Sequence, residues 1–451
     1  MLAIPLRLRP NHWWARALLV VFLLNLAGLP FLFSSEDMQG GTQNWDTRIL
    51  STVALRELHP LRWFWSDWPL GNGFYRPLPS LSFLLDARLW KTNWPLYRLQ
   101  EFAAAIACAL LVVWLVWELT QNRGWSLGAG VIFSVQQTDL GIFTHLFSVA
   151  LLLAAGAAAF AGAKKKLSLP AAAVLVFATS RFASEVVGSP FDCDFWGFSY
   201  GYRAMGWPPG RTAVFMTAFG LVCLASFVRW CRCGSFGWLV AAFASFVFAI
   251  FCYEQAAVIP ALLVGSALCA APREWRRWSA PCLVAFAITA VYWRWHLTAI
   301  PMDTKYEADH RRGMINATLD VVGYLLPGGL DVANAIEKIH YGTTLEDMLA
   351  DRSYAWTLYS IVSTIAAFSL ARKHWRYLLL GILGSVVAYA PLAIARPLFH
   401  YLYLPQAIRS VAIVVIGAAL LDYATPAFRN LWPQRASTCE SEPVPRGKSE
   451  A

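Results

Sequence analysis

The amino-acid sequence predicts an all-α, polytopic integral membrane protein with about twelve transmembrane helices. Three observations lead to this fold class. Hydrophobic residues make up 58% of the 451 residues and charged residues only 14%, whereas a soluble globular protein carries about 25% charged residues. Apolar stretches of about 20 residues, enough to cross the hydrocarbon core, recur along the chain. Short polar or basic turns separate them.

The hydropathy pattern predicts one membrane domain over residues 1–424 and a polar, disordered cytoplasmic tail over 425–451. The first apolar run resembles a secretory signal, but no small-residue cleavage site follows it, so we expect an uncleaved first helix. The predicted spans are 16–34, 99–120, 126–142, 144–163, 167–189, 212–229, 235–252, 255–271, 278–296, 355–371, 376–394 and 405–422.

Lys and Arg cluster in the short turns between alternate spans, which accounts for the net charge of +10 without nucleic acid as a partner. The positive-inside rule then predicts that both termini are cytoplasmic. The clusters are Arg123, Lys164 to Lys166, Arg229 with Arg232, Arg273 with Arg276 and Arg277, and Arg372 with Lys373 and Arg376. Three long segments, 35–98, 190–211 and 297–354, fall on the outer face, where we expect the chemistry.

The first outer segment, 35–98, is rich in Trp and Pro. It contains amphipathic stretches such as Ile49 to Leu58, which indicate helices that lie in the membrane interface.

Four short motifs follow one another along the chain. They are Phe74 to Asp86 (FYRPLPSLSFLLD), Trp207 to Thr212 (WPPGRT), Tyr253-Glu254-Gln255 with Pro260, and Arg396 with Tyr401 to Pro405 (YLYLP). In this order they resemble motifs of the GT-C superfamily of membrane glycosyltransferases, in particular the protein O-mannosyltransferase branch and its bacterial relatives. The resemblance implies a GT-C-like fold. It also implies transfer of a sugar from a polyprenyl-phosphate donor to a lipid, glycan or protein acceptor at the outer face.

The sequence also departs from that family. Ala213 stands where the family has Asp, and the family's His-Pro…Glu segment has no His-Pro here. Either Val135-Gln136-Gln137 or Ser184-Glu185-Val186 could stand for that segment. The region 126–190 contains an extra pair of predicted spans. No tetratricopeptide repeats follow the last span, so the resemblance favours a bacterial member in the inner membrane. The departures leave open a GT-C-like scaffold without catalytic activity.

The resemblance implies that a carboxylate after the first span acts as general base or orients the acceptor. Glu36 and Asp37 occupy that position, and Asp46 is the reserve candidate. Sugar transfer needs a base near the acceptor and cations near the departing phosphate. The alternative is that both carboxylates only end a helix and are solvated.

Four basic residues are candidates for the donor phosphate: Arg396, His400, Arg211 and Arg76. A guanidinium presents a fork of N–H donors that matches phosphate oxygens. The alternative for Arg396 is an anchor to lipid headgroups.

Four further residues are expected to line the site. Arg181 and Glu185 are spaced i to i+4 in an apolar span, so they can pair on one helix face away from lipid. Glu254 lies at an outer turn, and Tyr403 belongs to the last motif. An intramembrane pair can equally serve only to lock helix packing.

No cofactor is expected. Asp192 and Asp194 have a spacing found in divalent-cation sites, but two carboxylates do not fill six coordination positions. The nine cysteines lack the spacing of a four-ligand metal site and are expected to be buried thiols.

A transporter or lipid flippase is the alternative from another class, because about a dozen spans with an intramembrane Arg and Glu fit it too. The two halves of the sequence show no convincing self-similarity.

Overall fold

The computed structural model describes residues 12–33, 45–91, 93–138, 169–187, 201, 205–300, 317–318, 321, 324, 352–393 and 399–431. Every regular element in these residues is a helix, and they contain no strand. The all-α prediction is therefore confirmed for the described part of the chain.

The long helices are α1 (His12–Asn25), α2 (Trp45–Arg56), α3 (Pro77–Trp90), α4 (Trp94–Thr120), α5 (Arg123–Gln137), α7 (Leu169–Val187), α8 (Arg211–Cys233), α9 (Phe236–Ile250), α10 (Ile259–Ala270), α11 (Trp275–Ala299), α16 (Arg352–Leu370), α17 (Trp375–Tyr389) and α18 (Tyr403–Leu431). Short 3₁₀ helices join them: η1 (Leu26–Phe33), η4 (Pro60–Phe64), η6 (Pro208–Gly210), η7 (Glu254–Val258), η8 (Pro272–Glu274), η9 (Arg372–His374), η10 (Ala390–Leu392) and η11 (Phe399–Leu402).

A helix lies in each predicted span except 144–163, which is outside the described residues. Five helical segments are long and apolar enough to cross a membrane: Trp13–Phe33, Pro95–Thr120, Pro208–Cys233, Arg372–Leu392 and Tyr403–Tyr423. These segments agree with a membrane-embedded chain, whereas the total of about twelve spans stays a prediction.

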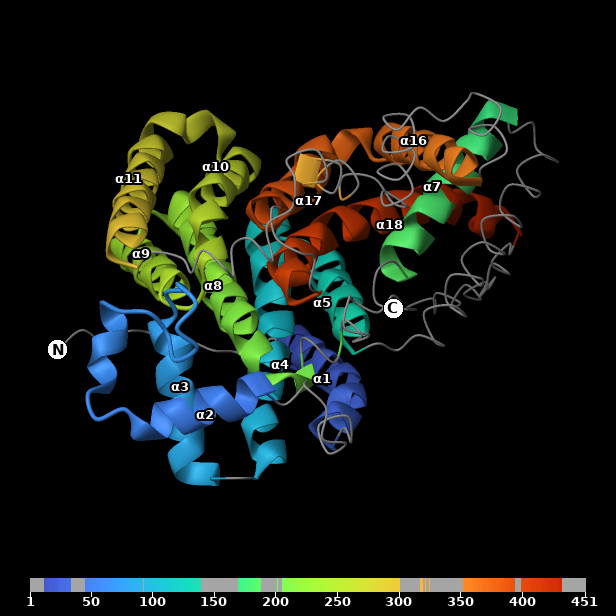
Figure 1. Ribbon diagram of the computed structural model, residues 1–451. Coiled ribbons are helices and arrows are strands. Elements are labelled where there is room, and N and C mark those ends of the chain that lie inside the picture. The colour runs from blue at the N-terminus through green and yellow to red at the C-terminus, as the bar shows by residue number, and fades with distance from the viewer. Residues whose placement is uncertain are drawn as a thin grey trace, which may run out of the picture.

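Helices α4 and α8 pack against each other in the middle of the molecule. Figure 1 shows α9, α10 and α11 on one side of them and α7, α16, α17 and α18 on the other. Small residues let α17 and α18 approach closely. A Cβ atom on Gly381 would lie only 2.6 Å from the Cβ of Ala412, so this crossing requires glycine.

The basic turns meet at one end of the bundle. Arg229, near the end of α8, is 3.0 Å from the Oε1 of Glu118 at the end of α4. The neighbouring Leu119 carbonyl accepts bonds from Arg232 of α8, at 2.9 Å, and from the Tyr377 hydroxyl of α17, at 3.3 Å. The turns that follow α4 and α8 and the turn that precedes α17 therefore lie together.

Arg277 of α11 caps the end of α8 at this same end of the bundle. Its guanidinium donates to the carbonyls of Trp230, at 3.3 Å, and Cys231, at 3.4 Å. Gly234 ends the helix with φ of 73°, a conformation that favours glycine. The sequence prediction that these basic turns share one face is in keeping with these contacts.

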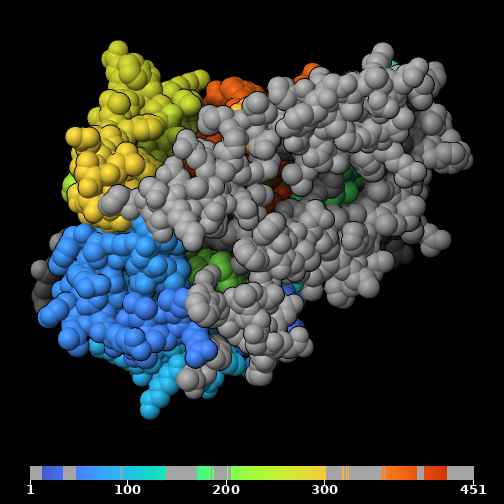
Figure 2. All heavy atoms as spheres, in the orientation of Figure 1, coloured from blue at the N-terminus to red at the C-terminus, as the bar shows by residue number. Residues whose placement is uncertain are grey.

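The first outer segment has a small core of its own. Leu50 and Ala54 of α2 pack with Phe83 and Ala87 of α3, whereas Leu55 is exposed. The predicted amphipathic helix therefore exists, and its exposed apolar face suits a membrane interface. Figure 2 shows the first outer segment, in blue, lying against α11, in yellow, and the ring of Tyr75 lies 4.8 Å from that of Trp295 in α11.

The prediction that the basic turns and the first outer segment lie on opposite sides of the membrane can be tested by cysteine labelling. Cys233 is exposed, and the other described cysteines are buried. In a Cys193→Ser, Cys439→Ser background, we expect an impermeant maleimide to label Cys233 only after the membrane of bacterial spheroplasts is opened. A His59→Cys variant, which places a thiol on the exposed first outer segment, should be labelled without opening. Labelling of both positions from the same side would contradict the arrangement.

Candidate functional site

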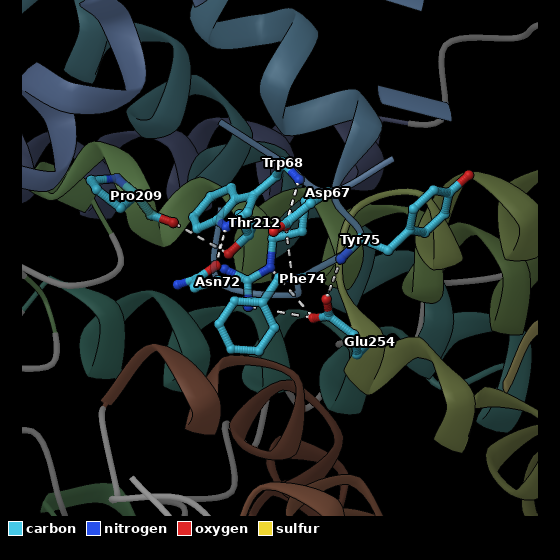
Figure 3. Close-up of polar contacts among 9 residues, drawn as sticks. Asp67, Trp68, Asn72, Phe74, Tyr75, Pro209, Thr212 and Glu254 are labelled. Atoms are coloured by element: carbon cyan, nitrogen blue, oxygen red, sulfur yellow. Dashed lines mark hydrogen bonds and ion pairs between the residues drawn. The ribbon is translucent and has the colours of Figure 1, made fainter. Parts of the chain in front are cut away.

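The first and third motifs are joined by an ion pair. Glu254, at the start of η7, accepts a bond from the backbone N–H of Tyr75 at 2.8 Å, and its Oε2 is 3.3 Å from the Nη2 of Arg76 (Figure 3). The N–H of Leu78 donates to the Phe251 carbonyl at 3.1 Å. The start of α3 is therefore fixed to the turn after α9.

Three aromatic rings surround the same guanidinium. The Cζ of Arg76 lies 4.5 Å from the ring centroid of Trp68, 4.2 Å from Phe74 and 4.5 Å from Tyr253. Each distance is within the range of a cation–π interaction. Arg76 is 7% exposed, so its charge is balanced by protein groups, and this environment favours a structural role.

Asp67 shapes the turn that supplies two of these rings. Its carboxylate accepts bonds from the backbone N–H groups of Trp68, Gly73 and Phe74 at 2.7, 2.8 and 3.0 Å (Figure 3). Burial raises the pKa of the Asp67 carboxyl above its usual value, although these donors and Arg76 oppose the shift. Hydrogen bonds between Asp67 and the turn's own backbone therefore stabilise this turn.

Arg211, in the second motif, joins that motif to the first. Its side chain is fully buried, and its Cζ lies 4.3 Å from the ring centroid of Phe83. Its N–H groups donate to the Asp86 carboxylate at 2.5 Å, Ser82 Oγ at 3.1 Å, Gln100 Oε1 at 3.0 Å, the Tyr97 carbonyl at 2.9 Å and the Pro208 carbonyl at 3.2 Å. The acceptors of these bonds lie in α3, α4 and η6, so one side chain joins three elements.

Gln255 connects the third motif to the fourth. Its Nε2 donates to the carbonyls of Ala388, at 2.8 Å, and Tyr401, at 3.1 Å. The rings of Tyr253 and Tyr401 stack with centroids 6.2 Å apart. The four motifs that carry the family resemblance are therefore linked in series: the second to the first, the first to the third and the third to the fourth.

Tyr403 extends this junction into the bundle. Its hydroxyl donates to Gln137 Oε1 at 2.5 Å, and the Gln137 amide donates to Asn25 and to the Ala105 carbonyl. Asn25 in turn donates to Ser134 at 2.9 Å. Buried polar groups in an apolar interior require partners of this kind, and the chain links α1, α4, α5 and α18.

The predicted i to i+4 pair is confirmed. Arg181 Nη2 lies 2.6 Å from Glu185 Oε1 on α7. Arg409 of α18 also binds Glu185, with its Nη2 at 2.6 Å from Oε1, and donates to the Tyr324 carbonyl. The sequence reasoning missed Arg409, although a charged residue in the apolar span 405–422 was a usable signal.

Glu101 of α4 was also missed. It is fully buried, and neither carboxylate oxygen has a hydrogen-bond partner among the described residues. Its nearest charged neighbours include Arg98, one turn earlier, whose Nη1 donates to the Phe31 and Leu32 carbonyls at 3.3 and 3.1 Å. A carboxylate inside the apolar run 99–120 could have been noticed from the sequence.

Several predicted site residues lie outside the described residues: Glu36, Asp37, Arg396, Asp192 and Asp194. The side chains of Asp46 and His400 are outside them too. Among the described residues, no group of three His, Cys, Asp or Glu side chains could hold a metal ion. The phosphate-binding roles of Arg76 and Arg211 stay predictions, and the protein contacts of both guanidinium groups favour a positioning role.

No protein-family model, curated protein or solved structure matches the chain.

The buried Arg211–Asp86 pair should contribute strongly to stability. Asp86→Asn leaves a buried guanidinium without its counter-charge, so we expect the free energy of unfolding to fall by about 3–5 kcal/mol. SDS titration of the protein in mixed micelles measures it. The control is Glu274→Gln, which breaks the exposed pair with Arg277 and should cost about 0–1 kcal/mol. An equal loss of unfolding free energy in both variants would show that the Arg211–Asp86 pair does not stabilise the packing of α3 against α4 and α8.

The Arg181–Glu185–Arg409 cluster allows a charge-balance test. Glu185→Gln leaves two buried guanidinium groups facing a neutral amide, whereas Arg181→Met keeps one pair between Glu185 and Arg409. We expect Glu185→Gln to lower the unfolding midpoint in SDS much further than Arg181→Met. The reverse order would show that Arg409 is not the main partner of Glu185.

Proposed function

We propose that the protein is an inverting membrane glycosyltransferase, which transfers a sugar from a polyprenyl-phosphate donor to a lipid, glycan or protein acceptor. The observation that carries the proposal is that side-chain contacts link the four motifs in series, through Arg76–Glu254, Arg211–Asp86 and Gln255. Motifs separated by long stretches of sequence have no reason to meet if each resembles the family only by chance.

The reaction needs a base near the acceptor and positive charge near the phosphate that departs. The acceptor hydroxyl or amine attacks the anomeric carbon, the bond from that carbon to the phosphate oxygen breaks, and polyprenyl phosphate leaves. Glu36 and Asp37 follow Leu32, whose carbonyl binds Arg98, so their segment begins beside α4. Arg396 precedes η11 in the sequence, and His400 belongs to η11, in which the Tyr401 carbonyl accepts a bond from Gln255.

The proposed site lies at the end of the bundle opposite the basic turns. If these turns are cytoplasmic, as the positive-inside rule predicts, the site faces the outer leaflet, and both termini are inside. The proposed location is a bacterial inner membrane. A polyprenyl-phosphate donor would reach the site through the lipid beside the interfacial helices α2 and α3.

The buried Arg181–Glu185–Arg409 cluster favours a second candidate function, a transporter or lipid flippase, because intramembrane charges often mark transport pathways. The two functions differ in their products. A transferase forms a new glycosidic bond, whereas a flippase moves an unchanged lipid across the membrane. A GT-C-like scaffold would do neither.

The direct experiment uses the full chain in liposomes with a radiolabelled polyprenyl-phosphate sugar. We expect label to move to an acceptor supplied by a membrane extract. Glu36→Ala with Asp37→Ala should lower the transfer rate by about 10²–10⁴-fold, the usual contribution of acid–base catalysis. Arg396→Ala should also lower it, because the leaving phosphate loses a cation.

Glu274→Gln is a matched control, because this carboxylate pairs with Arg277 at the opposite end and should leave the rate unchanged. Transfer at the wild-type rate by the double variant would refute the assigned base. Movement of intact labelled donor between leaflets, without a new bond, would establish the flippase function instead.

A further inference from the structure

The first outer segment presents three large apolar side chains that remain largely exposed. Leu58 is 85% exposed, Leu61 62% and Trp65 64%. All three fall within residues 58–65, in and around η4, and Arg56 and Arg62 beside them are exposed as well. We call these five residues the tip surface. Neighbouring apolar side chains that stay exposed in this way mark an interaction site.

Helix α11 connects the first outer segment to the basic turns. Near the start of α11, Arg277 donates to the Trp230 carbonyl at the end of α8. Near its end, the ring of Trp295 packs against that of Tyr75. The 25 residues of α11 give it a length of about 37 Å, and a hydrocarbon core is about 30 Å thick. The contacts with Tyr75 therefore lie about one membrane thickness from the basic turns.

The last turns of α11 have the composition of a lipid–water interface. Trp293 and Trp295 flank Arg294, which is exposed, and no described residue forms an ion pair with its guanidinium. Val291 and Leu297, each about one turn from Arg294, are exposed and apolar. Tryptophan gathers at the level of the headgroups, and an arginine near a helix end extends its charge to that level. The end of α11 therefore marks the interface.

The tip surface is held at this same level. The Tyr75 hydroxyl donates to the Phe64 carbonyl in η4 at 2.9 Å, and the Tyr75 ring lies against Trp295. The Phe64 ring meets the Phe251 ring, just after α9, edge-on with centroids 5.4 Å apart. Figure 2 shows the first outer segment lying against the end of α11. Lipid headgroups are therefore the surroundings that the tip surface meets.

The charge of the first outer segment suits an anionic partner. Glu57 pairs with Arg62 at 2.8 Å, so Arg56 supplies the net charge of the tip. The positive-inside rule favours basic residues at the other end of the bundle, so exposed cations here call for another reason. Among residues 47–91, the exposed Lys, Arg, Asp and Glu side chains are all basic: Arg48, Arg56, Arg62, Arg88 and Lys91.

We propose that the tip surface docks on the leaflet opposite the basic turns and binds anionic phospholipid headgroups there. Leu58, Leu61 and Trp65 enter the boundary between headgroups and acyl chains. Arg56 and Arg62 donate hydrogen bonds to the lipid phosphate oxygens, which match the fork of a guanidinium. This inference does not depend on the proposed sugar transfer.

Lipid contact can be measured at Leu61 with the full chain in nanodiscs. In a Cys193→Ser, Cys233→Ser, Cys439→Ser background, Leu61→Cys carries a nitrobenzoxadiazole fluorophore. The control carries it at Arg88→Cys, in the last turn of α3, which runs away from α9 and α11 in Figure 1. We expect nitroxide-labelled phospholipid to quench the fluorophore at position 61 and aqueous iodide to spare it. The fluorophore at position 88 should show the reverse pattern.

The preference for anionic lipid has its own matched variants. At equal concentration, nitroxide-labelled phosphatidylglycerol should be enriched at position 61 about fivefold over nitroxide-labelled phosphatidylcholine, the factor that one arginine near an anionic headgroup supplies. Arg56→Gln should bring quenching by the two lipids close to equality. Arg88→Gln removes the same charge from the far end of α3 and should leave the preference unchanged.

Three results would overturn the proposal. Quenching of position 61 by iodide, as strong as at position 88, would mean that the tip surface faces water. Equal quenching by the two labelled lipids without Arg56→Gln would reduce the contact to a purely apolar one. Shielding of position 61 from both quenchers would show that protein, such as a second copy of this chain, covers the tip surface.

Discussion

The ion pair and hydrogen bonds of the Arg211 guanidinium are the interaction on which the end of the molecule that holds α3 and the starts of α4 and α8 depends. It is fully buried, yet it holds α3 through Ser82 and Asp86 and the start of α4 through the Tyr97 carbonyl. A charge in this environment is tolerated only when its donors are engaged. Because its own backbone begins α8, one side chain sets the position of three helices, and the remaining motif contacts are built on that frame.

Hydropathy and charge were enough to predict the helical class, the approximate position of the described spans and the grouping of the basic turns. These features depend on local composition, because a helix in lipid must be apolar over about 20 residues and each of its ends carries a readable signal. The Arg181–Glu185 pair was predictable for the same reason, since spacing on one helix fixes its geometry.

The partners of buried charges across different helices were not predictable in this way. Arg211 was singled out as a phosphate ligand, and its protein partner Asp86, which lies 125 positions earlier in the chain, was not predicted. Arg409 and Glu101 were overlooked, although each is a charge near the start of a predicted apolar span. A lone sequence has no local pattern that tells which helices will pack together, so these contacts needed the tertiary structure.

The Arg76–Glu254 pair also bears on how the chain is made. The partners are separated by 178 positions, and the aromatic enclosure of Arg76 includes Tyr253, the neighbour of Glu254. At about 5–20 residues per second, the ribosome reaches Glu254 roughly 10 to 40 s after Arg76. Throughout that interval the first outer segment lacks the Glu254 and Tyr253 side chains that Arg76 contacts in the folded protein. The first outer segment can therefore take its final position only after α9 and the turn that follows it have been synthesised.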